Sequence, residues 1–335
     1  MKNQKNDNFL NKDAHSYANF NDVRIKHLKL DLRVDFSDKT LDGKVDISIE
    51  NYTKAKQLIL DSKDLTIHKV LLEDSIQTSF SLGEKSEVFG QPLTVEVEPS
   101  TKVVSVYYTT SPDAEALQWL TPEQTLGKVH PFLFSQSQAI LARSWVPCQD
   151  GPGVKFTYEA TIKTDPNLIA LMSAENGTTK NENGVYTFKM DQPISSYLLA
   201  LTVGDLAFAS TGRNSGVYAE PAMLEKSVWE LNSMQSMIDS AEKLYGPYAW
   251  ERYDVVILPP SFPFGGMENP RLTFATPTII AGDRSLVALI AHELAHSWSG
   301  NLVTNETWND FWLNEGFTVY FEQRIMEKIF GKPYE

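Results

Sequence analysis

Residues 23–208 alternate between apolar and polar positions, which is the pattern of half-buried β-strands. From Leu28 to Phe36, and again from Val45 to Ile49, every second residue is apolar. The polar segment Ser37–Gly43 between these runs predicts a hairpin connection. We expect further strands at Gln57–Leu60, Thr66–Leu72, Leu93–Val97, Val103–Thr109, Phe156–Thr164, Val185–Met190 and Leu198–Gly204. Many short strands with polar turns predict a mostly antiparallel, β-sandwich-like N-terminal domain.

After Tyr218 the apolar positions recur every three or four residues, as in helices. This spacing, followed by Gly246 and Pro247, predicts one amphipathic helix over Pro221–Tyr245. The change of period indicates a domain boundary near residues 208–214 and an α+β protein. We predict three parts: a flexible leader over residues 1–20, an N-terminal β domain over residues 21–208 and a second domain over residues 209–335.

The second domain is predicted to contain a strand and two further helices. Tyr253–Leu258 is a short apolar run typical of a buried strand. Asp283 can cap a helix over Ser285–Ser299, which the following glycine can end. A last helix is expected from Asn309 to Gly331.

Composition narrows the class of protein. Of the 335 residues, 42% are hydrophobic and 22% are charged, as in ordinary globular proteins. The net charge of −13 argues against nucleic acid as a partner. The amino terminus lacks the apolar core of a signal peptide, and no apolar run has membrane-spanning length, so we expect a cytoplasmic protein without a membrane partner. Cys148 is the only cysteine, and we interpret it as a packed thiol rather than a nucleophile.

Two histidines and two glutamates form the clearest chemical motif. His292 and His296 are four residues apart in a predicted helix, so both side chains lie on one face. Glu315 follows nineteen residues after His296. Two histidines and one carboxylate, with a fourth position open to water, are a ligand set of catalytic zinc. Glu293, beside the first histidine, is placed to take a proton from that water.

The alternative to a zinc site is a histidine cluster with a structural role, or a solvated helix with two surface histidines. The apolar residues around the motif indicate a buried helix, and buried histidines need partners, which a metal supplies. Gly316, next to Glu315, costs about 1 kcal/mol relative to alanine inside a helix. We therefore expect tight space at Gly316 near the metal.

A glycine-rich segment precedes the predicted metal-binding helix. Its prolines restrict the backbone, while Gly265 and Gly266 allow a close approach to another group. An exposed edge here can pair with a bound peptide as an added strand. Glu268 can then hold the α-ammonium group of that peptide. The alternative is a Gly-Gly turn followed by a surface glutamate. Phe264 and Met267 are expected to shape the first side-chain pocket.

Together these motifs resemble the M1 (gluzincin) aminopeptidases. The similarity covers Gly265-Gly266-Met267-Glu268-Asn269 within residues 260–270, the motif at residues 292–296, and residues 297–305 and 311–316. It extends to the branch that contains leukotriene A4 hydrolase and aminopeptidase B. The resemblance implies that residues 209–335 are the first part of a thermolysin-like α/β catalytic domain that binds one zinc ion per chain.

The resemblance also implies a role for each matching residue. His292, His296 and Glu315 would bind zinc, Glu293 would be the general base, and Glu268 would anchor the substrate amine.

The segment Phe134–Ala139 is similar to a loop that reaches into the active site of these enzymes. Gln138, with Gln136 near it, would help to bind the first substrate residue. Without the family, this run is an ordinary polar loop. Phe264 departs from the tyrosine that leukotriene hydrolases usually carry there, so a hydroxyl is lost beside the first pocket.

Members of the family also use a tyrosine that stabilises the oxyanion, several dozen residues after the position of Glu315, and a helical C-terminal domain. Both are expected beyond Glu335, in a missing C-terminal portion of the same protein. Tyr320 and Tyr334 are given no catalytic role. Loss of one oxyanion donor typically costs about a hundredfold to a thousandfold in rate.

The predicted function is a zinc metallo-aminopeptidase that acts on peptides with a free amino terminus. An endopeptidase would use the same metal site without the anchor at Glu268. A truncated, non-catalytic fragment that binds zinc and peptides is the second alternative. The resemblance leaves an epoxide hydrolase side activity open.

Overall fold

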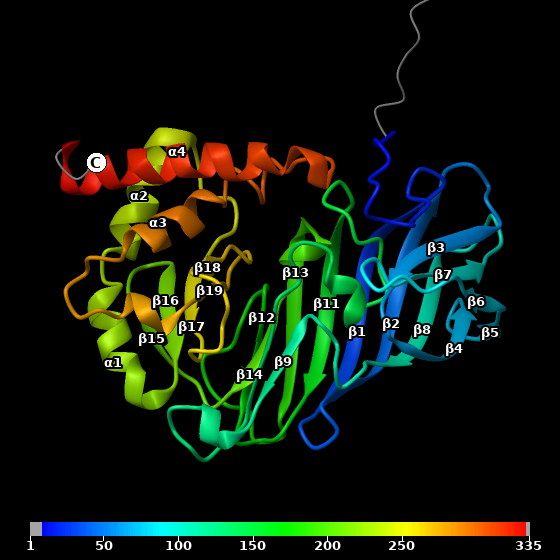
Figure 1. The fold of residues 1–335 in the computed structure, drawn as a ribbon, viewed down its shortest axis with the longest axis horizontal. Coiled ribbons are helices and arrows are strands. Elements are labelled where there is room, and N and C mark those ends of the chain that lie inside the picture. Colours follow the sequence, from blue (N-terminus) through cyan, green and yellow to red (C-terminus); the bar gives the residue numbers. More distant parts are fainter. Residues whose placement is uncertain (1–8, 333–335) are drawn as a thin grey trace, which may run out of the picture.

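The computed structural model describes residues 9–332 (Figure 1). Residues 1–8 of the expected leader, and Tyr334, lie outside the described residues. From Asp13 to Phe20 the leader prediction is wrong, because this segment packs against the protein. Asp13 accepts a hydrogen bond from the backbone of Trp308 at 3.1 Å, and the Ser16 hydroxyl donates to Asp61 at 2.6 Å. Polar composition predicted a loose segment but could not reveal these distant partners.

The largest sheet contains seven strands in the order β13-β11-β1-β2-β8-β4-β5. Its neighbours are antiparallel except β1 and β11, which are parallel. The strands are β1 (Val23–Asp35), β2 (Thr40–Asn51), β4 (Thr66–Leu72), β5 (Ile76–Gln77), β8 (Val103–Thr109), β11 (Lys155–Lys163) and β13 (Val185–Ser195). The apolar residues of the alternating runs face the core, as their period predicted.

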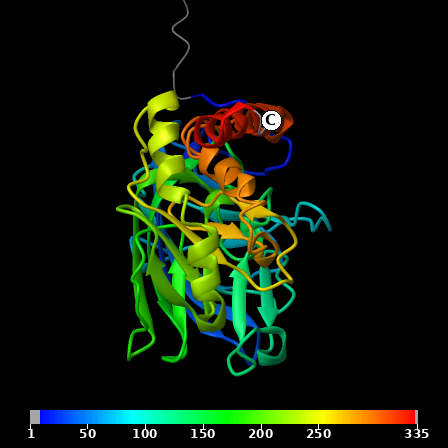
Figure 2. The same ribbon diagram turned by 90° about the vertical axis from the view of Figure 1, so that its left-hand side faces the viewer.

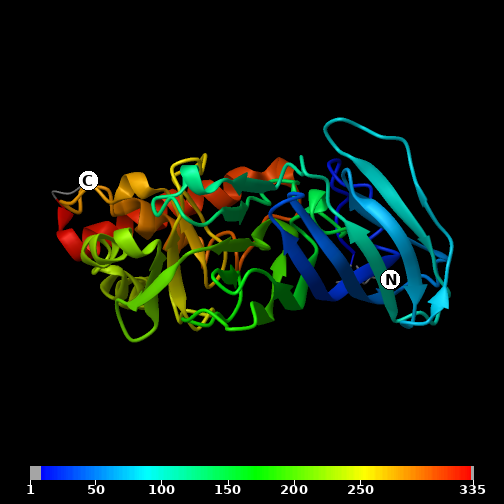
Figure 3. The same cartoon turned by 90° about the horizontal axis from the view of Figure 1, so that it is seen from below.

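Two smaller sheets accompany the large one: the three-stranded sheet lies at the end of the molecule away from the helices, and the four-stranded sheet lies between the large sheet and the helices (Figures 1 and 3). One contains β3 (Gln57–Ser62), β7 (Gln91–Glu96) and β6 (Phe80–Leu82), and the other contains β12 (Ile169–Met172), β14 (Leu201–Gly204), β10 (Phe132–Ser135) and β9 (Leu117–Leu120). The predicted strand Leu198–Gly204 is wrong in its first half, because Ser196–Leu198 form a 3-10 turn. The whole segment is buried, so no alternation marks the start of the strand.

A five-stranded mixed sheet underlies the site, with helices packed above it (Figures 1 and 2). Its order is β15-β16-β17-β19-β18, so β18 is an edge strand. The elements are β15 (Ala207–Ser210), β16 (Ser215–Ala219), β17 (Tyr253–Ile257), β18 (Gly266–Met267), β19 (Thr273–Ala275), α1 (Pro221–Glu230), α2 (Met234–Tyr245), α3 (Ala288–Ala295) and α4 (Phe311–Phe330). The architecture is therefore mixed α+β, as predicted.

Two of the predicted helices need correction. The single helix over Pro221–Tyr245 is wrong, because residues 231–233 separate α1 from α2. Leu231, inside the break, and Met234, directly after it, are both buried, so the apolar spacing continues through the break. Asn and Ser at the break favour turns and caps over helix interiors.

The helix predicted over Ser285–Ser299 is also too long, since α3 spans only Ala288–Ala295. Asp283 accepts a hydrogen bond from the Ser285 backbone at 2.9 Å and caps a turn before α3. The last helix agrees better with its prediction: α4 ends at Phe330, and Gly331 follows with φ of 87°.

Two apolar cores support the site. The larger fills the β sheets and continues into the glycine-rich segment through Phe262 and Met267. The smaller joins all four helices to β16 and β17. Cys148 is buried in the larger core as a free thiol, as predicted. Among the described residues, no helix combines the length and the apolarity that membrane spanning requires.

Candidate active site

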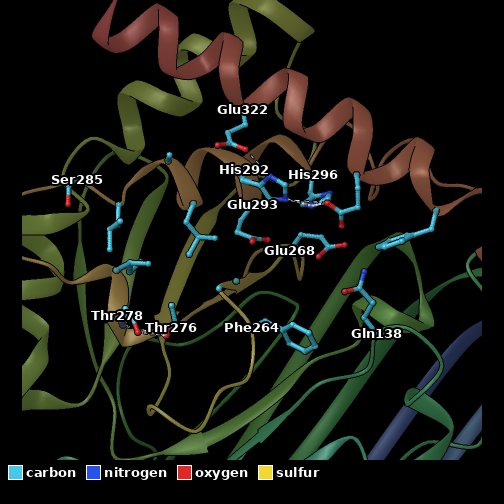
Figure 4. A pocket seen from close by; sticks show the side chains of 18 residues that line it. Gln138, Phe264, Glu268, Thr276, Thr278, Ser285, His292, Glu293, His296 and Glu322 are labelled. Atoms are coloured by element: carbon cyan, nitrogen blue, oxygen red, sulfur yellow. Dashed lines mark hydrogen bonds and ion pairs between the residues drawn. The ribbon is translucent and has the colours of Figure 1, made fainter. Parts of the chain in front are cut away.

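The two motif histidines and Glu315 converge on one point. His292 lies in α3 and His296 directly follows its last residue on the same face, with the two Nε2 atoms 3.2 Å apart. α4 brings Glu315 Oε2 to 3.4 Å from His292 Nε2 and 3.8 Å from His296 Nε2. Figure 4 shows the two rings meeting above the cavity. Ligand atoms of the three residues all lie within 4.8 Å of one another, which forms a candidate metal site.

The outer nitrogen of each ring is held by a second group. His292 Nδ1 lies 3.0 Å from Glu322 Oε2, and His296 Nδ1 lies 3.1 Å from the carbonyl oxygen of Ser299. The Thr318 hydroxyl lies 3.1 Å from the same His296 nitrogen. Such partners fix the orientation of metal-binding histidines. A proton on each Nδ1 leaves a lone pair on each Nε2, and a cation is the natural partner of two lone pairs that face each other.

The electrostatics of the site agree with a cation at this point. Burial lowers the pKa of His292, but hydrogen bonds with Glu315 and Glu322 outweigh it and raise the pKa to about 10. The hydrogen bond with His292 is the main reason that the pKa of Glu315 is lowered. The two carboxylates therefore favour positive charge at His292, which a metal cation can supply in place of a proton.

Two buried carboxylates face the same region. Glu268 and Glu293 are only 4% and 5% exposed, and burial raises the pKa of both, for Glu293 well above its ordinary value. Glu268 Oε1 has no hydrogen-bond partner among the described residues. Its backbone carbonyl accepts from Asn301 Nδ2 at 2.8 Å, which fixes this part of the chain. A buried carboxylate with a free oxygen is suited to binding a cationic group.

These residues line a cavity of about 760 Å³. Its walls include Gln138, Phe264, Gly265, Gly266, Glu268, Thr276, Thr278, Ile279, Ser285, Leu286, Ala288, Leu289, His292, Glu293, His296, Phe311, Glu315 and Glu322. The loop that carries Gln138 does reach this cavity, and Figure 4 shows its amide directed into it.

Gln136 and Met267 lie behind the wall rather than in it. Met267 is 2% exposed, and Gln136 Nε2 donates to its sulfur at 3.1 Å. Gln136 therefore supports the glycine-rich strand from the N-terminal side.

The expectation of tight space at Gly316 is wrong. A β-carbon at Gly316 would meet no described atom within 4 Å. The tight glycine is Gly266, where a β-carbon would lie 2.3 Å from Glu293 Oε1. Gly265 is also closely packed, because a β-carbon there would lie 3.0 Å from Leu289 Cδ1. Spacing along one helix cannot show which glycine faces a neighbour.

Comparison with known families identifies the chain. The "Peptidase M1 N-terminal domain" matches residues 24–198, and the "Peptidase family M1 domain" matches residues 229–334. The chain belongs to peptidase family M1. The family and the leukotriene A4 hydrolase branch are as the motifs predicted, and His292, His296 and Glu315 form its candidate metal site.

Named relatives and solved structures of the M1 family support this assignment. The chain is 46% identical to leukotriene A-4 hydrolase of Xenopus laevis, over 96% of this chain and 54% of that protein. It is also 46% identical to leucine aminopeptidase 2 of Yarrowia lipolytica, over 96% of this chain and 50% of that protein. The yeast leukotriene A4 hydrolase structure with bestatin superposes with a TM-score of 0.91 at 38% identity, over 99% of this chain and 52% of that chain. The chain thus spans about half the length of the relatives that it matches.

The sequence motifs did not reveal Glu322, which contacts one of the candidate metal ligands. Glu322 lies seven residues after Glu315 in α4, hence on the same helix face, and it reaches His292. The spacing could have suggested it, but several other residues of this helix share that face.

Proposed function

We propose that this protein is a zinc metallo-aminopeptidase that removes the first residue of peptides with a free amino terminus. The observation that carries the proposal is the convergence of His292, His296 and Glu315 beside two buried carboxylates. A zinc ion held by the three residues would supply Lewis acidity and an activated water. Its family and the donor set support zinc, with one ion per chain as the expected content.

Glu293 is proposed as the general base. Its carboxylate shares a cluster with Glu268 and His296 in which ligand atoms lie within 4.8 Å of one another. Burial raises its pKa, so it can accept a proton from water and then give it to the leaving amine.

Glu268 is proposed to bind the α-ammonium group. Its free Oε1 and its burial suit a charge-assisted hydrogen bond. Strand β18, which leads into Glu268, lies at a sheet edge where a peptide backbone can add as a further strand. With the amine fixed there, cleavage falls after the first residue. Gln138, and Gln136 through Met267, are proposed to shape the pocket for that residue.

The test uses alanyl-naphthylamide and its N-acetylated form, with and without a zinc chelator. Chelator-sensitive hydrolysis of the free amine alone supports an aminopeptidase. Glu293→Gln should abolish turnover while zinc remains bound, and Glu268→Gln should raise KM for the free amine. An endopeptidase would cleave the acetylated substrate and tolerate Glu268→Gln.

Because the relatives are about twice as long, the assay includes a form of the protein extended to their length. Zinc binding without turnover in the 335-residue chain, and turnover only in the longer form, would identify the described part as a non-catalytic fragment. No turnover in either form would reject the enzymatic function.

A further inference from the structure

Asn301 connects the metal-binding histidines to the segment that carries Glu268. It is 1% exposed and lies in the loop that follows α3. Asn301 Nδ2 donates to the Glu268 backbone carbonyl at 2.8 Å, and the Asn301 backbone N–H donates to the His296 carbonyl at 3.0 Å. The side chains of Glu268 and His296 lie next to each other in Figure 4. One residue therefore ties the proposed amine anchor to a candidate metal ligand.

The loop around Asn301 is held together without its side chain. The Gly300 backbone N–H donates to the Val303 carbonyl at 2.8 Å, and the Thr304 hydroxyl donates to the Gly300 carbonyl at 2.5 Å. A substitution at Asn301 leaves these groups in place. Asn301 Oδ1 has no hydrogen-bond partner among the described residues, so the side chain contributes here through its contact with Glu268.

Lys155 supports Asn301 from the N-terminal β domain. It lies in β11 of the seven-stranded sheet, and its Nζ donates to the carbonyl oxygens of Asn301 at 2.9 Å and of Leu302 at 3.1 Å. Hydrogen bonds from an ammonium group are stronger than those between neutral groups. The large sheet thus holds the backbone of Asn301, and Asn301 holds the backbone of Glu268.

The position of the Glu268 carboxylate depends on this backbone. Glu268 is buried, and its Oε1 has no hydrogen-bond partner among the described residues that would hold it from the side. A shift of the backbone therefore moves Oε1 relative to His296 and to the metal site. Misplacement of a substrate-positioning group by about 1 Å can cost about a hundredfold in rate.

We propose that Asn301 is a positioning residue for the substrate amine, which holds Glu268 at a fixed distance from the metal site, and that Lys155 extends this support to the N-terminal domain. This inference rests on the aminopeptidase function proposed above. Asn301 is not among the residues that line the cavity, so it acts through Glu268 and not by touching the substrate.

The test measures the binding of alanine hydroxamate and of its N-acetylated form to the zinc-loaded protein by titration calorimetry. Both ligands carry the metal-binding hydroxamate, but only the first has an α-ammonium group. We expect the wild type to prefer the free amine by about tenfold or more, and Asn301→Ala to lose most of this preference. Its zinc affinity should stay at the wild-type level, because the backbone contact with His296 remains.

A double-mutant cycle separates positioning from a general disturbance of the site. Because Asn301 acts through Glu268, adding Asn301→Ala to Glu268→Gln should leave the Kd of alanine hydroxamate unchanged. A further weakening in the double variant, or a full preference in Asn301→Ala alone, would overturn the inference but leave the aminopeptidase intact. A wild type without preference for the free amine would defeat the amine anchor itself, and the proposed aminopeptidase with it.

Asn305→Ala is the matched control. Asn305 is buried in the same loop, but its Nδ2 donates to the Thr307 carbonyl at 2.9 Å, away from the proposed anchor. This variant should keep the wild-type preference, and an equal loss in Asn305→Ala and Asn301→Ala would overturn the assignment. Lys155→Met should lose part of the preference, whereas Lys163→Met, exposed on the same strand, should keep it. An unchanged preference in Lys155→Met would remove the N-terminal domain from the proposal.

Discussion

Gly266 lies directly against the carboxylate of Glu293, so that a β-carbon at position 266 would come within 2.3 Å of Glu293 Oε1. The two residues belong to different elements, β18 and α3. The glycine thus sets how closely the edge strand approaches the proposed base. A side chain there must displace either the strand or the carboxylate.

Gly266→Ala is therefore expected to lower kcat by about a hundredfold, because a displaced Glu293 no longer reaches the attacking water. Zinc content should stay at the wild-type level, since none of the three ligands is touched. Steady-state kinetics and metal analysis check both expectations.

Gly316→Ala is the matched control, because a β-carbon there meets open space. It lies next to a zinc ligand yet should leave kcat unchanged and stabilise α4 by about 1 kcal/mol. Equal losses of activity in both glycine variants would contradict the assignment of tight space to Gly266.

Glu322→Gln should weaken zinc binding by about tenfold to a hundredfold, because Glu322 Oε2 lies 3.0 Å from His292 Nδ1 and orients that ring. Competition with a chromogenic chelator measures the affinity. Glu327→Gln removes a carboxylate from the same helix that pairs with Arg324 instead, and it should bind zinc normally. If both variants bind zinc as tightly as the wild type, Glu322 has no orienting role.

Lys155 should make stability rise between about pH 8 and pH 10.5. Burial lowers its pKa to about 8 in the folded protein, whereas the unfolded chain keeps the ordinary value of 10.5. Between these values the unfolded state binds more protons, so raising the pH favours folding. Denaturant unfolding at pH 7.5 and pH 9.5 should show this gain, and Lys155→Met should lose it. Lys163→Met, on the same strand but exposed, should retain the wild-type slope.

Arg143→Met is expected to destabilise the fold by about 3–5 kcal/mol, because it leaves two buried carboxylates without their cation. Arg143 Nε donates to Asp150 Oδ2 at 3.0 Å, and Arg143 Nη1 lies 3.7 Å from Asp61 Oδ1. The side chains of Arg143 and both aspartates are fully buried. Urea unfolding measures the loss, and Arg33→Met at an exposed ion pair should cost far less. A small effect of Arg143→Met would mean that water enters the cluster.

Local patterns in the chain were enough to predict most of the main strands and helices and the candidate metal-ligand motif. The two-residue period placed strands such as Thr66–Leu72 and Val103–Thr109 at their observed bounds. The helical spacing of His292 and His296 is a property of the backbone alone, so their shared face followed from the sequence. Strands β10 and β12 were missed, because short buried segments carry no alternation.

Such local patterns could not predict which residues of different elements contact one another. The pairing of Glu322 with His292 and the closeness of Gly266 to Glu293 both depend on how α3, α4 and the edge strand pack. The sequence marked Gly316 as the constrained glycine, whereas packing put the constraint at Gly266. Periodicity describes how one segment meets its surroundings, but the distance between two segments is set by the side chains that fill the space between them.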